Sequence, residues 1–193
     1  MTQYAFATTW VLEAPIDRVW STLQDAQRWR DWFPAFRRVD LLEPGAQDGL
    51  GAVLELTTRA LLPYDLVARI RTARVDRPHL LELTSLGDLD GSGRFTLAEE
   101  DGVTTVRFEW RVTTTKPWMN ALAPIARPLF AWNHDVAMTA AGRGLARVLG
   151  VRLLANESGP VQRGEGRLAT VTLLAGVVLA GAAVVIGRRA RRA

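Results

Sequence analysis

One strand pattern follows another through residues 39–115, with no helical pattern between them, and this constrains the fold more than any other feature. Strands are expected at 39–42, 52–59, 64–75, 80–84, 94–99 and 103–115, separated by turn-forming segments such as EPGAQDGLG, DRPH and GDLDGSG. In the last strand one side is apolar throughout: Val106, Phe108, Trp110 and Val112. Such alternation is typical of an antiparallel sheet covered on one face. A parallel, doubly wound sheet is disfavoured because helices do not alternate with these strands.

A strand and two short helices are expected before this region. Tyr4–Glu13 alternates as a half-buried strand does, and Ile16, Val19, Trp20 and Leu23 fall on one face of a short helix. Asp25 is positioned to cap a second short helix, which Pro34 ends. The chain should therefore open as strand, helix, helix.

Residues 118–150 form the long helical stretch. Its most apolar face is predicted to contain Leu129, Asn133, Ala137, Ala140, Gly144 and Val148, with a kink near Pro128. A curved sheet of seven strands, the opening strand included, can bury its apolar face against this helix. The predicted fold class is therefore α+β, with room for a cavity between sheet and helix.

The C-terminal part has a different composition. Residues 151–167 contain the Gly-, Ser- and charge-rich run ANESGPVQRGEG, which is typical of a linker. Leu168–Ile186 then forms a run of 19 residues without a charge, which as a helix would be about 28 Å long. We expect this run to cross a lipid bilayer once, followed by a basic tail at 187–193. The N-terminal residues lack the pattern of a secretory signal, which favours a cytoplasmic location for the globular domain, residues 1–150.

Charge and composition exclude several functions. Four of the 24 basic residues lie in the tail, so residues 1–187 carry 20 basic and 20 acidic side chains. A neutral domain lacks the basic face that nucleic-acid binding requires. The chain has no cysteine and only two histidines, and its acidic residues show no metal-binding spacing, so no metal site is expected. No cofactor is expected either, because no glycine-rich turn leads into a helix as in nucleotide-binding proteins.

Several local motifs resemble those of a known family. They are APIDRVWSTLQD, RWRDWFP, the Gly49-Leu50-Gly51 turn and GLARVL near the end of the long helix. Together with the order of elements over residues 3–150, they resemble the START-like superfamily, also called SRPBCC, and within it the polyketide cyclase and dehydrase group. This resemblance implies the helix-grip fold, in which a curved sheet surrounds a long C-terminal helix. It also implies a cavity for a hydrophobic small molecule or lipid, in which some members cyclise or aromatise polyketides.

Candidate site residues follow from the expected cavity between sheet and helix. Ligand contacts are predicted for Trp29, Trp32, Phe33, Tyr64, Phe108, Trp110, Leu122 and Asn133. Each aromatic residue could equally be part of the core, and the Asn133 amide could bond to the backbone or to water instead. The candidates for proton transfer are Tyr64, Asn133 and His134. His134 and Asp135 are adjacent, so on a helix they should point about 100° apart, and a surface or half-buried His134 is the simpler interpretation.

The sequence thus predicts that the chain binds a hydrophobic ligand beside the membrane, for transfer to or presentation at the bilayer. A cyclase or aromatase acting in the same cavity is the enzymatic alternative. A non-catalytic membrane assembly factor, with side chains filling the pocket, is the third possibility. An empty cavity of several hundred Å³ would discriminate binding from a purely structural role, because ligand pockets usually occupy about 300 to 1,000 Å³.

Overall fold

A computed structural model describes residues 3–59, 65–115 and 123–161. The elements follow in the order β1 (Gln3–Leu12), α1 (Ile16–Gln24), η1 (Ala26–Arg28), α2 (Trp29–Trp32), β2 (Phe36–Glu43), β3 (Val53–Thr58), β4 (Leu66–Asp76), β5 (Leu80–Gly87), β6 (Leu89–Glu100), β7 (Val103–Thr114), α4 (Ala123–Leu149) and β8 (Leu153–Pro160). No helix within the described residues is long and apolar enough to cross a membrane. The predicted span Leu168–Ile186 and the tail at 187–193 lie outside those residues.

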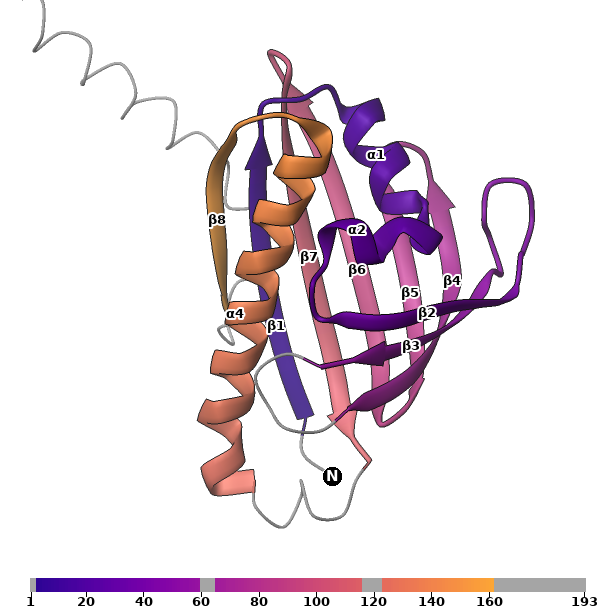
Figure 1. The fold of residues 1–193 in the computed structure, drawn as a ribbon, viewed down its shortest axis with the longest axis vertical. Helices are drawn as coiled ribbons and strands as arrows, with labels where there is room; N and C mark the ends of the chain where they lie inside the picture. The colour runs from indigo at the N-terminus through magenta and orange to yellow at the C-terminus, as the bar shows by residue number, and fades with distance from the viewer. Residues whose placement is uncertain (1–2, 60–64, 116–122, 162–193) are drawn as a thin grey trace, which may run out of the picture. The chain divides into compact units, whose positions relative to one another are not determined.

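The strands form one antiparallel sheet in the order β2-β3-β4-β5-β6-β7-β1-β8. In Figure 1, the sheet curves around α4, which runs alongside β1, while α1 and α2 lie over the same face. This arrangement confirms the α+β helix-grip prediction. The predicted number of strands is wrong, because the sheet has eight rather than seven.

The additional strand, β8, lies within the predicted linker. It pairs with β1 from Leu12 opposite Leu153 to Phe6 opposite Pro160. Asn156 Nδ2 also donates a hydrogen bond to the Thr139 carbonyl of α4, at 2.9 Å. Pairing with β8 satisfies the backbone groups along one side of β1, which would otherwise be a sheet edge. The linker prediction is therefore wrong for residues 153–160.

Alternating burial along the strands builds the core, as the sequence indicated. Alternate residues of β1 from Tyr4 to Leu12 are buried, and β4 alternates in the same way from Leu66 to Thr72. Residues 89–93, predicted as part of a turn, instead belong to β6. Glycine permits this pairing, since a Cβ on Gly91 would lie 2.0 Å from the Arg111 carbonyl oxygen of β7. Residues 89–93 therefore form a strand although their composition is typical of a turn, because pairing with β7 brings the two backbones close together.

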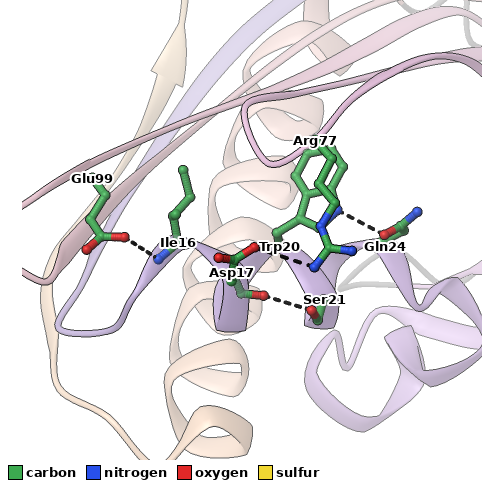
Figure 2. A network of polar contacts seen from close by, with 7 residues as sticks. All are labelled: Ile16, Asp17, Trp20, Ser21, Gln24, Arg77 and Glu99. Atoms are coloured by element: carbon green, nitrogen blue, oxygen red, sulfur yellow. Dashed lines mark hydrogen bonds and ion pairs between the residues drawn. The ribbon is translucent and has the colours of Figure 1, made fainter. Parts of the chain in front are cut away.

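A polar contact holds the first turn of α1 to the sheet, and a second polar contact lies within the helix (Figure 2). Glu99 of β6 accepts a hydrogen bond from the Ile16 backbone N–H at 2.7 Å, which caps the first turn of a helix whose N-cap, Pro15, has no side chain to do so. Trp20 Nε1 donates to Gln24 Oε1 at 2.9 Å near the other end. The predicted cap by Asp25 is not formed, because its side chain makes no capping hydrogen bond to the short helix that follows.

The inward face of α4 agrees with the predicted one only in part. Asn133 and Ala137 of the predicted face line the cavity and Gly144 is buried, but the buried positions also include Phe130, His134, Met138, Ala141, Leu145, Ala146 and Leu149. Leu129 and Val148 are partly exposed, at 44% and 37%. The predicted face followed hydrophobicity alone, whereas the observed one includes a buried imidazole. Gly144 permits the closest contact, since a Cβ there would lie 1.9 Å from the Trp32 carbonyl oxygen of α2.

Candidate ligand-binding site

A cavity of about 180 Å³ lies between the sheet, α2 and α4. Its lining comes from nearly every element of the core: Trp29, Trp32, Phe33, Ala35, Phe36, Leu56, Thr58, Arg59, Leu66, Ala68, Ile70, Leu83, Ser85, Leu89, Phe95, Phe108, Trp110, Phe130, Asn133, His134, Ala137 and Met138. This volume is smaller than the several hundred Å³ expected of a ligand pocket, but it exceeds an engineered apolar cavity of about 150 Å³ that binds benzene. The helix and sheet therefore leave space for at least one ring between them.

Stacked aromatic pairs form part of the cavity wall. Trp29 stacks on Phe36 with ring centroids 5.7 Å apart, which joins α2 to β2. On the sheet, Phe95 and Phe108 stack across β6 and β7 at 4.2 Å. Gly93 leaves room for the Phe108 ring, because a Cβ at this position would lie 3.0 Å from it. Large rings fixed by their neighbours provide apolar contact area at little cost in side-chain entropy.

Three polar side chains in the wall already have protein partners. Ser85 Oγ donates to the Leu89 carbonyl at 2.5 Å, and Thr58 Oγ1 donates to the Leu66 carbonyl at 3.4 Å. Arg59 pairs through Nε with the Asp65 carboxylate at 2.7 Å, at an exposed position. These groups leave the cavity wall mainly apolar, which suits a hydrophobic ligand.

His134 of α4 differs from these residues because it is deeply buried. Its exposed fraction is 7%, so it is more buried than the surface or half-buried position that the sequence suggested. The ring stacks on Phe6 of β1 at 4.2 Å and on Trp110 of β7 at 5.3 Å. Burial lowers the pKa of His134 to about 4, against the opposing effect of the Asp135 charge. The imidazole is consequently neutral at pH 7.

The carboxylate of Asp135, the next residue of α4, lies beside the His134 ring. Its Oδ1 is 3.6 Å from His134 Nδ1, just beyond hydrogen-bonding distance. Ser158 of β8 donates from Oγ to Asp135 Oδ1 at 2.9 Å, and Thr8 Oγ1 lies 3.0 Å from Ser158 Oγ. Since the Ser158 hydroxyl proton is used in the first bond, the Thr8 hydroxyl donates in the second. Ser158 of β8 thus holds the Asp135 carboxylate beside the ring, although the two α4 side chains make no hydrogen bond to each other.

Most of the predicted site residues do meet at the cavity. Of those described, all line it: Trp29, Trp32, Phe33, Phe108, Trp110, Asn133 and His134. Tyr64 and Leu122 lie outside the described residues. The wall formed by β3, β4 and β5 was not predicted, nor were Phe95, Phe130 and Met138. The alternation of apolar and polar residues along a strand predicts which side chains face inward. It does not predict how far along the strand the cavity extends.

The arrangement can bind an apolar molecule and offer it a neutral imidazole. Within the described ranges, no group of three histidine or acidic side chains is placed to hold a metal ion. Asn133 and His134 are polar side chains of the cavity lining.

Solved structures with the same fold include enzymes and proteins of other descriptions. The aromatase/cyclase ZhuI from Streptomyces sp. R1128 aligns with a TM-score of 0.65 at 19% identity, covering 77% of this chain and 94% of the other. The di-domain aromatase/cyclase BexL aligns with a TM-score of 0.61 at 23% identity, covering 78% of this chain and 51% of BexL. A START superfamily protein from Mycobacterium smegmatis aligns with a TM-score of 0.57 at 14% identity, covering 76% and 97%. At these identities the likeness establishes the fold alone.

No curated protein sequence matches this chain significantly. A family model described as "Polyketide cyclase / dehydrase and lipid transport" matches residues 3–150, which include every described element except β8. The curved sheet, the long helix and the apolar cavity between them agree with that match. The chain therefore belongs to the polyketide cyclase/dehydrase and lipid transport family.

Proposed function

We propose that this protein binds a hydrophobic small molecule or lipid in the helix-grip cavity and holds it beside a bilayer for transfer or presentation. The observation that carries the proposal is the cavity itself, whose lining is almost entirely aromatic and aliphatic. A protein that served only as a scaffold would gain stability by filling such a space, because unfilled apolar volume lowers the free energy of unfolding. An open cavity therefore favours ligand binding over the assembly-factor alternative.

Filling the cavity tests the binding function. Ala137 of α4 lines the cavity, whereas its neighbour Val136 is 37% exposed and is not part of the lining. Ala137→Phe should weaken binding of the apolar fluorescent probe N-phenyl-1-naphthylamine by at least about tenfold, because the new ring occupies the ligand's space. Val136→Phe adds the same ring on the same helix and should leave the dissociation constant unchanged.

The natural ligand can be identified from the full chain. Native mass spectrometry of the protein in detergent, followed by solvent extraction, should recover one class of apolar compound from the wild type and less of it from Ala137→Phe. Equal recovery from the two proteins would mean that the compound binds outside the cavity, which would contradict the proposal.

Membrane tethering is the second part of the proposal, and it is supported by the sequence of Leu168–Ile186. These 19 uncharged residues are long enough to cross a hydrocarbon core. Val177→Arg introduces a charge near the middle of the run, which costs about 3 kcal/mol for insertion. The variant should move from the carbonate-resistant membrane fraction to the supernatant. Reporter fusions at each end test the proposed cytoplasmic position of the domain.

A cyclase or aromatase acting in the same cavity is the second candidate. His134 favours it, because a neutral imidazole in an apolar cavity can accept and return a proton. The extracted compound can be returned to ligand-free protein and its mass and absorption spectrum followed. Conversion that His134→Gln abolishes would support the enzyme, and an unchanged compound would support binding alone.

A further inference from the structure

Two polar groups in the cavity wall are buried without a hydrogen bond to any described residue. They are the imidazole of His134, at both ring nitrogens, and the indole N–H of Trp32. An unpaired polar group of this kind destabilises the folded protein, and most buried groups in native structures are paired. The other polar groups considered above, on Ser85, Thr58 and Arg59, have partners. Unpaired buried atoms also occur away from the cavity, at Trp10 Nε1 and Asn156 Oδ1, but those on His134 and Trp32 belong to residues that a ligand can reach.

The surroundings of His134 distinguish its two nitrogens. Nδ1 is the nitrogen 3.6 Å from Asp135 Oδ1, and a carboxylate near Nδ1 favours the tautomer with the proton on that atom. Asp135 is held in place by the hydrogen bond from Ser158, which Thr8 in turn supports. In this tautomer Nε2 carries a lone pair and no proton. Nε2 is then a hydrogen-bond acceptor without a partner among the residues that the structure describes.

We propose that His134 Nε2 accepts a hydrogen bond from a hydroxyl group of the ligand, and that Ser158 and Asp135 are positioning residues that set its tautomer. The ligand class is an apolar, ring-bearing molecule with a hydroxyl group at the α4 side of the cavity. This inference rests on the proposed binding function and adds the chemical feature that the site selects. The positioning role of Ser158 lies outside residues 3–150, which the family model matches, because Ser158 belongs to β8.

Packing alone does not account for an imidazole at this position. The ring lies between Phe6 and Trp110, and the rest of its surroundings in the cavity wall are mainly apolar. Phenylalanine would make the same stacking contacts without an unpaired nitrogen. A water molecule is a poor substitute for a ligand here, since buried waters usually make about three hydrogen bonds. Burial also holds the pKa of His134 at about 4, so the lone pair is present throughout the neutral range.

A pair of ligands that differ in one group tests the acceptor. The full chain in detergent is titrated with 2-naphthol and with 2-methylnaphthalene, which have similar shapes but differ in the hydroxyl. The ratio of their two dissociation constants is then measured for the wild type and for His134→Phe. A net buried hydrogen bond corresponds to a change of about fivefold in this ratio. We expect the preference for 2-naphthol to fall by that factor in the variant, while 2-methylnaphthalene binds both proteins.

Each outcome of the titration has a defined meaning. An unchanged ratio with both compounds bound overturns the role of His134 and leaves the proposed binding function intact. Failure of both compounds to bind the wild type contradicts the proposed function and this inference together. His79→Gln is the matched control, because His79 is the other histidine and does not line the cavity.

Nitrogen-15 NMR of the histidine rings tests the positioning residues without any ligand. The chain has two histidines, so His79→Gln assigns the signals. We expect His134 to show the Nδ1–H tautomer in the wild type and a mixture of tautomers in Ser158→Ala, with Ser158→Thr restoring the wild-type pattern. A purely structural Ser158 would leave the tautomer unchanged in all three proteins. An Nε2–H tautomer in the wild type would overturn the proposal, even if His134→Phe failed to fold.

Discussion

Replacing His134 with phenylalanine should reduce the loss in the free energy of unfolding that the protein shows as the pH falls. In the folded state, burial lowers the pKa of His134 from 6.5 to about 4. In the unfolded chain the ring titrates near its ordinary value. Between these two values the unfolded chain binds a proton that the folded protein does not. This contribution is therefore fully present above pH 6.5 and is lost as the pH falls toward 4.

The magnitude follows from the difference between the two pKa values. The linkage relation gives a loss of about 2.5 kcal/mol in the free energy of unfolding between pH 7.5 and pH 4.5 from this residue alone. Other groups also contribute in acid. The Arg152 guanidinium, for example, lowers the pKa of Glu13 through hydrogen bonding and charge. Such contributions are common to both proteins, so the difference between their pH profiles isolates His134. Phenylalanine keeps the stacking on Phe6 and Trp110.

The assay is urea unfolding of the full chain in detergent, followed by tryptophan fluorescence at pH 7.5, 6.0 and 4.5. The wild type should lose about 2.5 kcal/mol more than His134→Phe over this range. Parallel profiles for the two proteins would refute the reasoning, because they would mean that the imidazole titrates alike in the folded and unfolded states.

Two further predictions concern packing. Glu99→Ala removes the acceptor for the Ile16 N–H and should lower the free energy of unfolding by about 1 kcal/mol, read from the urea midpoint. An unchanged midpoint would show that water caps α1 equally well. Gly144→Ala should cost about 2 kcal/mol despite alanine's higher helix propensity, because the new Cβ meets the Trp32 carbonyl oxygen. Gly150→Ala meets no atom within 4 Å and should cost only about 1 kcal/mol, through its positive φ of 66°. Equal losses at the two glycines would contradict the close contact between α2 and α4.

Much of the fold could be predicted from local patterns. Seven strands and the long helix were expected near their observed positions, because alternation along a strand and three-to-four-residue spacing along a helix reflect burial on one face. The inward face of α4 was predicted only in part: Asn133 and Ala137 do line the cavity, but the burial of His134 and the exposure of Leu129 were not expected, since His134 is polar and Leu129 is apolar. Contact with Phe6 and Trp110, from distant parts of the chain, decided which of the two is buried.

The site was predicted in part for the same reason. Trp29, Trp32, Phe108 and Trp110 were expected to face the cavity and do line it. The contact between Asp135 and Ser158 could not be predicted, because it joins a helix to a segment whose composition is typical of a linker. That segment forms a strand by pairing with β1, and its own residues have little preference for the extended state.

The amino-acid sequence by itself determined which side of most strands is apolar, the order of helices and strands along residues 3–150, and the family to which the chain belongs. These features depend on local periodicity and on motifs read in order. Only the tertiary structure decided that β8 completes the sheet, that α4 is rotated to bury His134, and that an unfilled cavity lies beside it. Each of these features depends on contacts between residues that are far apart in the chain. Such contacts produce no periodic pattern in the sequence, so they cannot be predicted from it.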